Sequence, residues 1–188
     1  DGYSSVTSEP ITITVTEVVV QYKMNAKYQI SDTGSKFQAA VDGKNIATVN
    51  NDLTATGSTG SVRAVNRFED ANGNTYVFSK WVSESGTFAN AASNETTFTP
   101  TSNGDVIAQY KRQYRVTCTT PNNGTLTASA TEPLAGDSYT ITVKPDDGYE
   151  LASLTVYLGD TATYGENVTS GVVNGTYTMK TAVNNARY

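Results

Sequence analysis

The stretch IAQYKRQYRV, residues 107–116, places Tyr110 and Tyr114 four residues apart among basic and apolar residues. A near copy, VQYKMNAKYQI, occupies residues 20–30. Repetition of one phrase within a chain indicates an array of similar structural units, because each unit reuses the same local pattern. The two copies therefore mark the places where one unit should meet the next.

Three segments of the chain share one ending, which predicts where the units stop. The segments are PITITVTEVVVQY (10–22), TTFTPTSNGDVIAQY (96–110) and GTYTMKTAVNNARY (175–188). Units should accordingly end at Tyr22, Tyr110 and Tyr188, at equivalent core positions. After the first two endings a similar beginning follows within a few residues, so the last strand of one unit should run almost directly into the first strand of the next.

These endings divide the chain into three parts. We expect a first β repeat module over residues 24–112 and a second over residues 113–188. Residues 1–23 should form the tail strand or strands of a preceding repeat, paired with the first module so that no β-branched edge is exposed.

Alternation of apolar and polar residues predicts strands along most of the chain. In DSYTITVKP, residues 137–145, Tyr139 and Ile141 share one face, and Pro145 ends the run because it lacks an N–H for the ladder. In DVIAQYKRQYRVTC, residues 105–118, only Arg112 interrupts the apolar face, which predicts the joint between two strands. The predicted fold is all-β, with two tandem small β-sandwich or β-grasp-like repeat modules.

Turn signals separate the predicted strands. They are Asn72-Gly73, interpreted as a type I′ hairpin turn, Asn123-Gly124 and Asp147-Gly148. The one segment with a helical alternative, KFQAAVDG at residues 36–43, is interpreted as a strand. The small and polar stretch from Gly86 to Glu95 is predicted to be a surface loop.

Composition excludes some classes of partner. The 188 residues are 37% hydrophobic and 16% charged, with a net charge of −5. Such a surface offers little to neutralise phosphates, so we expect no nucleic acid as a partner. No apolar run approaches the ~20 residues of a membrane helix, so we expect no membrane insertion. Because the chain starts at Asp1 without an initiator Met or a signal peptide, we expect a piece of a longer protein.

Catalytic and metal chemistry find little support in the residue types. The chain has no histidine, so neither a Ser-His-Asp triad nor a histidine zinc site can be assembled. The paired carboxylates Glu69-Asp70 and Asp146-Asp147 flank turns in different modules, whereas glycoside hydrolysis needs two carboxyls across one cleft. We predict no catalytic, cofactor-binding or metal-binding residues, no cofactor and no enzyme activity; ligand-binding residues stay unknown.

The sequence offers two specific alternatives, a calcium loop and an isopeptide bond. Asp70, Asn72 and Asn74 occupy the first, third and fifth positions of a calcium loop, but the sixth is Thr75 where glycine is required, and a hairpin explains the same residues. For an isopeptide bond, no motif selects a lysine–asparagine pair. The available lysines are Lys23, Lys27 and Lys111.

Other features favour structural roles. The single cysteine, Cys118, is predicted to be a buried and unreactive thiol. Trp81 is predicted to be a core residue, although twelve tyrosines and one tryptophan could also form a sugar-stacking platform. The sequons at Asn94, Asn123, Asn167 and Asn174 are expected to carry no glycan. Any ligand surface should lie in the loops at residues 86–95 or 158–170.

The segment that follows Gln113 resembles a known family. YRVTCTTPNNGTLTASATEPLAGDSYTITVKPDDGYELASLTV, followed by NGTYTMKTAVNNARY, has the strands, the glycine turns and the closing aromatic of the divergent InlB B-repeat and related bacterial repeat modules. The resemblance spans residues 113–188. In the first module, NGNTYVFSKWVSESG resembles the family's hairpin and its tryptophan at Trp81, whereas residues 31–58 depart from the pattern.

This resemblance implies a function without chemistry. Modules of this family serve as stalk or adhesion segments of bacterial secreted or cell-surface proteins, so the expected location is extracellular or attached to the cell wall. The expected partners are neighbouring repeat modules of the same chain and host or cell-wall glycans or proteins. The alternative is a carbohydrate-binding accessory module of a larger extracellular enzyme, which would need an exposed strip of aromatic side chains.

Overall fold

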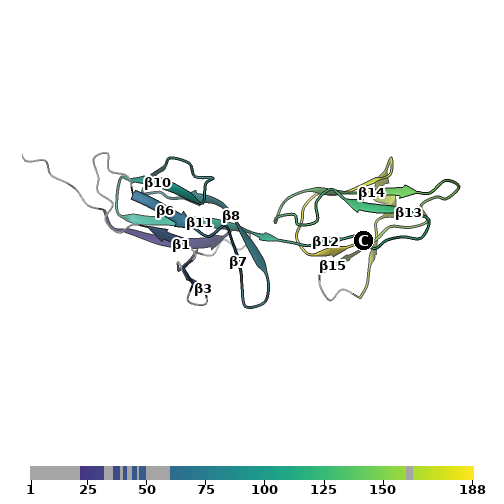
Figure 1. Ribbon diagram of the computed structural model, residues 1–188, viewed down its shortest axis with the longest axis horizontal. Coiled ribbons are helices and arrows are strands. Elements are labelled where there is room, and N and C mark those ends of the chain that lie inside the picture. Colours follow the sequence, from purple (N-terminus) through teal and green to yellow (C-terminus); the bar gives the residue numbers. More distant parts are fainter. Residues whose placement is uncertain are drawn as a thin grey trace, which may run out of the picture.

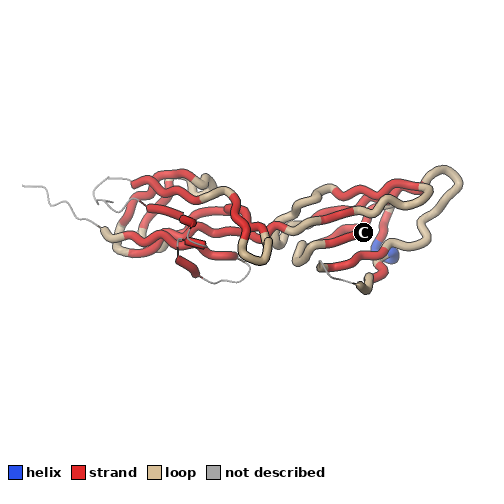
Figure 2. Tube along the Cα trace, turned by 60° about the horizontal axis from the view of Figure 1, so that its bottom comes forward, coloured by secondary structure: helices blue, strands red, loops and turns tan. Residues whose placement is uncertain are grey.

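The computed structural model describes residues 22–31, 60–159 and 163–188, together with the backbone of short strands between residues 36 and 49. Apart from one 3-10 turn (η1, Thr169–Gly171), all regular structure in these residues is β. Figure 2 shows strands and loops along almost the entire described trace. The prediction of an all-β fold is confirmed.

The first eleven strands form the first sandwich. They are β1 (Met24–Ile30), β2 (Lys36–Gln38), β3 (Ala40–Val41), β4 (Lys44–Asn45), β5 (Ala47–Val49), β6 (Gly60–Ala64), β7 (Arg67–Glu69), β8 (Thr75–Val82), β9 (Gly86–Phe88), β10 (Glu95–Pro100) and β11 (Gly104–Gln113). One sheet has the order β2-β1-β11-β8-β7 and the other β5-β6-β10-β9, with β3 and β4 as a separate pair.

The remaining strands form the second sandwich. They are β12 (Val116–Thr117), β13 (Gly124–Ala128), β14 (Tyr139–Pro145), β15 (Thr155–Leu158), β16 (Glu166–Asn167), β17 (Val172–Val173), β18 (Thr176–Met179) and β19 (Ala186–Arg187). Its sheets have the orders β12-β19-β15-β16 and β13-β14-β18-β17. Figure 1 shows the two sandwiches end to end along the long axis of the molecule.

The two sandwiches repeat one topology. In each, the first strand lies parallel to the last strand, and the last strand is also paired with an antiparallel neighbour, so that β1-β11-β8 corresponds to β12-β19-β15. The second sheets correspond strand by strand, β5-β6-β10-β9 to β13-β14-β18-β17. The shared endings in the sequence thus correspond to shared positions in the fold. The exact module boundaries, residues 24–112 and 113–188, stay a prediction.

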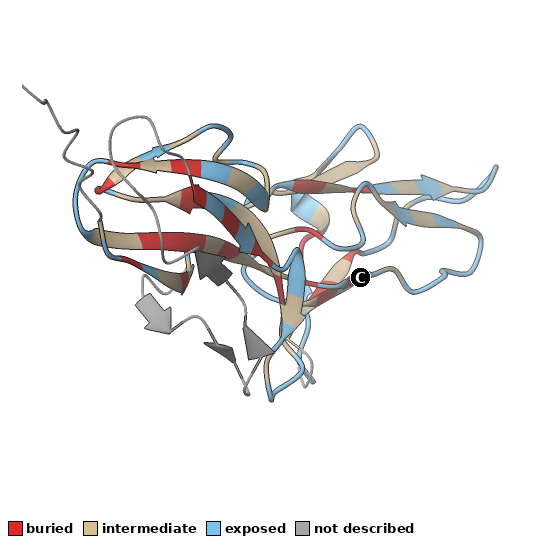
Figure 3. Cartoon of the chain, turned by 60° about the vertical axis from the view of Figure 1, so that its left-hand side comes forward, coloured by how far each residue is buried: buried red, intermediate tan, exposed pale blue. Residues whose placement is uncertain are grey.

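Each sandwich has its own hydrophobic core, contributed by both of its sheets. The first core is centred on Trp81, Phe98 and Tyr110, and the second on Tyr139, Ile141 and Val156. Figure 3 shows buried residues concentrated on strands, with turns exposed. Trp81 and Tyr110 are 1% and 0% exposed, which confirms the prediction that both are core residues.

The recurring tyrosines hold equivalent places in these cores. Tyr110 ends the part of β11 that pairs with β1, and its hydroxyl donates a hydrogen bond to the Val65 carbonyl at 2.6 Å. Tyr188 lies just after β19 and shares a 3.0 Å hydrogen bond with the hydroxyl of Tyr139. Burial raises the pKa of both phenols above the ordinary value. Tyr22, half-buried, packs against the first core.

Two predictions for the strands and loops need correction. The stretch from Gly86 to Glu95 is not a loop throughout, because residues 86–88 form β9 and Glu95 begins β10. The reason is Phe88, whose ring packs against Trp81 and Phe98 at centroid distances of 5.9 and 4.7 Å and draws the segment into the sheet. Only residues 89–94 connect the strands.

The turn at Asn72-Gly73 is a hairpin, as predicted, but not of type I′. A type I′ turn requires positive φ at both central residues, and of these two only Gly73 has it, at 77°. The Gly73 N–H donates to the Asp70 carbonyl at 3.0 Å and the Asp70 N–H to the Asn74 carbonyl at 3.0 Å, which makes a longer connection between β7 and β8. The carboxylate of Asp70 is the cause, because it organises this connection.

The remaining predicted strands and turns agree with the structure wherever the structure describes them. Strands β2 and β3 confirm the strand interpretation of KFQAAVDG for the residues of that segment that the structure describes, 36–38 and 40–41, and Pro145 is the last residue of β14. Turns occur at Asn123 and at Asp147-Gly148. The strand predicted in residues 10–22 lies outside the described residues, except for Tyr22.

Candidate functional site at the junction

The connection between the sandwiches is a nearly continuous strand. β11 extends three residues beyond Tyr110, and only Tyr114 and Arg115 separate it from β12. This segment is hydrogen-bonded to residues 131–135 of the second sandwich: the Tyr114 N–H donates to the Pro133 carbonyl at 2.9 Å and the Ala135 N–H to the Arg112 carbonyl at 2.7 Å. The last strand of the first sandwich is therefore also an edge of the second.

Further contacts attach the same strand to the second sandwich. Gln113 of β11 forms an antiparallel bridge with Leu134, and β12 continues this edge through the Val116 N–H, which donates to the Thr131 carbonyl at 2.8 Å. Lys111 lies 3.7 Å from the carboxylate of Asp137. The predicted joint at Arg112 is thus close to the observed one, which lies two residues later and has no free linker.

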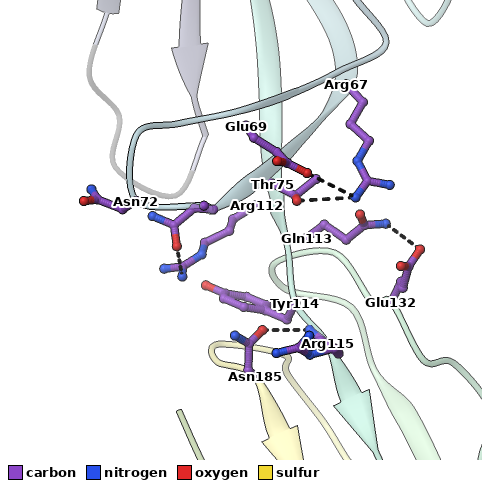
Figure 4. Close-up of a pocket in the computed structure, with 12 residues that line it drawn as sticks. Arg67, Glu69, Asn72, Thr75, Arg112, Gln113, Tyr114, Arg115, Glu132 and Asn185 are labelled. Atoms are coloured by element: carbon purple, nitrogen blue, oxygen red, sulfur yellow. Dashed lines mark hydrogen bonds and ion pairs between the residues drawn. The ribbon is translucent and has the colours of Figure 1, made fainter. Parts of the chain in front are cut away.

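Beside this strand lies a polar groove with a volume of about 340 Å³. Figure 4 shows residues of the first sandwich on one side of it and residues of the second on the other. Its charged lining residues are Arg67, Glu69, Arg112, Arg115 and Glu132. Asn72, Asn74 and Asn185 add side-chain amides. The sequence singled out Arg112, Glu69 and the asparagines of the Asp70 loop for other reasons, but it did not bring them together with Arg67, Arg115, Glu132 and Asn185, because the groove forms only where two sandwiches meet.

Arg112 is the residue that joins the parts of the groove. Its guanidinium donates a hydrogen bond to the side-chain oxygen of Asn74 and lies over the ring of Tyr114, 5.1 Å from the centroid. Its Nε is buried and has no hydrogen-bond partner. The interruption of the apolar alternation at this position is therefore the one signal in the sequence that marked the groove.

Other lining residues of the groove form one ion pair and several hydrogen bonds within the chain. Arg67 lies 3.9 Å from Glu69 and donates to Thr75, and Gln113 donates to Glu132 at 3.4 Å. Asn185 accepts a hydrogen bond from the Arg115 N–H at 2.7 Å. Of these, only the Gln113–Glu132 hydrogen bond runs from the first sandwich to the second, and the others fix side chains within their own sandwich.

In the loop of residues 70–74, the Asp70 carboxylate is hydrogen-bonded by neighbouring groups of the same loop and by Tyr76. Asp70 accepts hydrogen bonds from the N–H groups of Asn72 and Asn74, from the Asn74 amide and from the Tyr76 hydroxyl, at 2.8–3.2 Å. Burial opposes ionisation of this carboxyl, but the hydrogen bonds outweigh it and lower its pKa below the ordinary value. In the part of the chain that the structure describes, no group of three or more acidic or cysteine side chains could hold a metal ion.

The other carboxylates and lysines that the sequence raised are dispersed. Asp146 and Asp147 flank the turn after β14, in the second sandwich, while Glu69 and Asp70 belong to the first. Lys27 forms an ion pair with Asp105 at 2.7 Å, with both side chains more than a quarter exposed. The Lys27 Nζ therefore lies against a carboxylate and not against an asparagine amide.

Aromatic side chains are mostly internal. Of the large apolar side chains in the described residues, Tyr149 and Tyr164 are the exposed aromatics, at 58% and 92% exposure. Tyr164 lies in the 158–170 region that was predicted to display a ligand surface. Trp81 is fixed in the core by a 3.0 Å hydrogen bond from its indole N–H to the Ser93 carbonyl.

Cys118 packs against the second core, and three of the sequon asparagines hold turn positions or bond the backbone. Cys118 is half-buried against the second core rather than fully buried as predicted, because it lies just past the two-residue strand β12. Burial raises the pKa of its thiol, which favours the less reactive protonated form. Asn123 and Asn174 hold turn positions with φ of 58° and 48°, and Asn94 donates to the Ala64 carbonyl.

The second sandwich has a recognisable family pattern. Residues 114–186 match the family model of the divergent InlB B-repeat domain. This match confirms the resemblance noted in the sequence and covers nearly all of the second sandwich, while the first lies outside it. The family is found in bacterial surface proteins. No curated protein and no solved structure matches the chain. In the described residues no helix is long and apolar enough to cross a bilayer.

Proposed function

We propose that the chain is a non-enzymatic stalk segment of a bacterial secreted or cell-surface protein, extracellular or attached to the cell wall. The observation that carries the proposal is the strand that leaves the first sandwich and is hydrogen-bonded to residues 131–135 of the second. A stalk must keep the orientation of each module fixed relative to the next. A junction without a free linker does so, because bending it breaks backbone hydrogen bonds.

The size of this effect follows from the bonds at the junction. One backbone hydrogen bond joins β11 of the first sandwich directly to residues 131–135, from the Ala135 N–H to the Arg112 carbonyl at 2.7 Å, and the bridge between Gln113 and Leu134 lies beside it. Such a bond contributes about 1 kcal/mol net, so bending at the junction costs at least this much. The N–H groups of Tyr114 and Val116 bond the same residues from the beginning of the second sandwich and continue this edge. The ion pair of Lys111 with Asp137 adds little, because it is exposed.

Partners follow from the same proposal. Neighbouring repeat modules of the same chain are the main ones, and an adhesive contact with a host or cell-wall glycan or protein would be a property of exposed loops. The carbohydrate-binding alternative needs an exposed strip of aromatics. The burial of Trp81, Tyr110 and Tyr139 supports the stalk instead.

The test measures whether the two sandwiches share one orientation in solution. Residual dipolar couplings of the backbone amides in a weakly aligning medium should fit a single alignment tensor over residues 60–159 and 163–188. The control is a variant with four Gly-Ser residues inserted between Gln113 and Tyr114, which should need two different tensors. Two tensors for the unmodified chain would overturn the proposal.

A further inference from the structure

The first sandwich holds its first and last strands together in parallel. β1 and β11 pair in register over seven positions, from Met24 opposite Gly104 to Ile30 opposite Tyr110. Backbone bonds continue the ladder at both ends, from the Gly104 N–H to the Lys23 carbonyl at 3.1 Å and from the Ser31 N–H to the Tyr110 carbonyl at 2.9 Å. The two strands where the chain enters and leaves this sandwich are therefore direct neighbours.

Parallel pairing decides how a pulling force is distributed. The chain enters at the start of β1 and leaves at the end of β11, so tension along the chain pulls the two strands in opposite directions along their own axes. All bonds of the ladder then carry the load together. Where two strands are pulled apart from the same end, the bonds break one after another, and each must resist the force alone.

Side chains add rungs between the same two strands. Asp105 on β11 bonds both Lys27, at 2.7 Å, and Asn25, at 3.4 Å, on β1. The amide of Gln109 donates to that of Gln29 at 2.8 Å. On the core face, the rings of Tyr28 and Tyr110 pack edge to face at 6.4 Å. Sliding one strand along the other breaks these contacts together with the backbone ladder.

The second sandwich has the same arrangement in a shorter form. β12 and β19 pair in parallel at two positions, Val116 with Ala186 and Thr117 with Arg187. Backbone bonds extend this ladder beyond the paired positions, from the Tyr188 N–H to the Thr117 carbonyl and from the Thr119 N–H to the Tyr188 carbonyl. β12 is an edge strand, whereas β1 is covered by β2.

We propose that the pairing of first and last strands is a tension-bearing clamp, strong in the first sandwich and weak in the second. Under stretching along the chain, the second sandwich opens first and the first stays folded to a higher force. The use of such a clamp in a cell rests on the proposed stalk function, because only a tethered segment is stretched. The mechanical property itself does not depend on it.

The decisive experiment stretches one folded protein in two directions. One variant carries Lys23→Cys and Gln113→Cys, and the other carries Lys23→Cys and Ser102→Cys. Both also carry Cys118→Ala, so that the handles attach only at the introduced cysteines. The first pair loads the β1–β11 ladder along the strands, and the second pulls both strands from the same end. The variants also differ in the residue replaced, Gln113 or Ser102, so urea unfolding followed by Trp81 fluorescence first checks that both have the same stability.

Optical-tweezer or atomic-force measurements should give a rupture force for the Lys23–Gln113 pair that is several-fold higher than for the Lys23–Ser102 pair. Equal forces in the two directions would refute the clamp. Dipolar couplings that show a flexible junction would overturn the proposed stalk function but not the clamp, provided that the rupture force still depends on direction. The two proposals can therefore fail separately.

The order of opening is tested by stretching the chain from Lys23 to Tyr188. A ten-residue Gly-Ser insertion at the Asp147-Gly148 turn lengthens the second sandwich by about 34 Å when it is extended, which identifies its event. We expect the event of increased length to come first and at lower force. The opposite order contradicts the assignment of the stronger clamp to the first sandwich.

Discussion

Replacing Tyr110 by phenylalanine removes one oxygen from the centre of the first sandwich and leaves the ring in place. The Tyr110 side chain is fully buried, and its hydroxyl donates a 2.6 Å hydrogen bond to the Val65 carbonyl. The substitution therefore tests whether the recurring tyrosine fastens the connection between β6 and β7 to the last strand. Its ring contacts with Phe68 and Phe78 stay available to phenylalanine.

The magnitude follows from the loss of one donor to an internal carbonyl. Such a loss costs about 1–2 kcal/mol, because the carbonyl keeps its desolvation penalty without its partner. With a denaturant slope of about 1 kcal/mol per M urea for a sandwich of this size, the unfolding midpoint should fall by ~1–2 M.

The assay uses the single tryptophan of the chain. Trp81 lies in the core of the first sandwich, so its fluorescence in urea reports the unfolding of that sandwich alone. The matched control is Tyr188→Phe, which removes the equivalent hydroxyl from the second sandwich, where it bonds Tyr139. That variant should shift the transition seen by circular dichroism but not the Trp81 transition. A Trp81 midpoint unchanged by Tyr110→Phe, or shifted equally by Tyr188→Phe, would refute the reasoning.

Three further substitutions test other parts of the structure. Gly86→Ala should destabilise the first sandwich by about 1–3 kcal/mol, because a Cβ there would lie 2.2 Å from the Thr99 carbonyl oxygen. The Cβ of Gly73→Ala meets nothing within 4 Å, so this variant carries only the cost of a positive φ of 77°, about 1 kcal/mol. Its urea midpoint should therefore fall less than that of Gly86→Ala, and equal midpoints contradict this. Asp70→Asn should be less stable than the original chain at pH 7, where the lowered pKa of Asp70 stabilises the fold. This stabilisation exists above the unfolded pKa of ~3.9 and is lost as pH falls through the folded value. The difference in urea midpoint between the two proteins should therefore narrow below about pH 4, and a constant difference contradicts the prediction. Cys118 should react with a thiol reagent more slowly in the folded chain than in urea, since burial raises its pKa; Cys118→Ala gives the blank, and equal rates mean that the thiol is not protected.

The sequence predicted correctly the features that depend on the local alternation of buried and exposed side chains along one strand. Alternation placed Tyr139 and Ile141 inside and ended β14 at Pro145, and the shared endings located Tyr110 and Tyr188. These signals are local, because a strand with one buried face must repeat with a period of two.

Features that depend on partners distant in the chain were missed. Phe88 is one aromatic residue within a polar stretch, and only its contacts with Trp81 and Phe98 make its segment a strand. The turn after β7 differs from the expected type because the Asp70 side chain bonds the loop backbone. The groove requires Arg67, Arg115 and Asn185 to meet across two sandwiches, and no spacing in the sequence announces that encounter.

The placement of the last strand also governs when each sandwich can form. β11 lies between β1 and β8, and β19 lies between β12 and β15, so in both sandwiches a central strand is the last one made. As the chain is synthesised from its N-terminus, β1 has to wait some eighty residues for its partner, and such distant pairing is slow. The first sandwich closes only when β11 is available, and the same strand then presents residues 112–116, already extended, to the segment that follows. Each completed sandwich in this way offers the next one a template on which to begin folding.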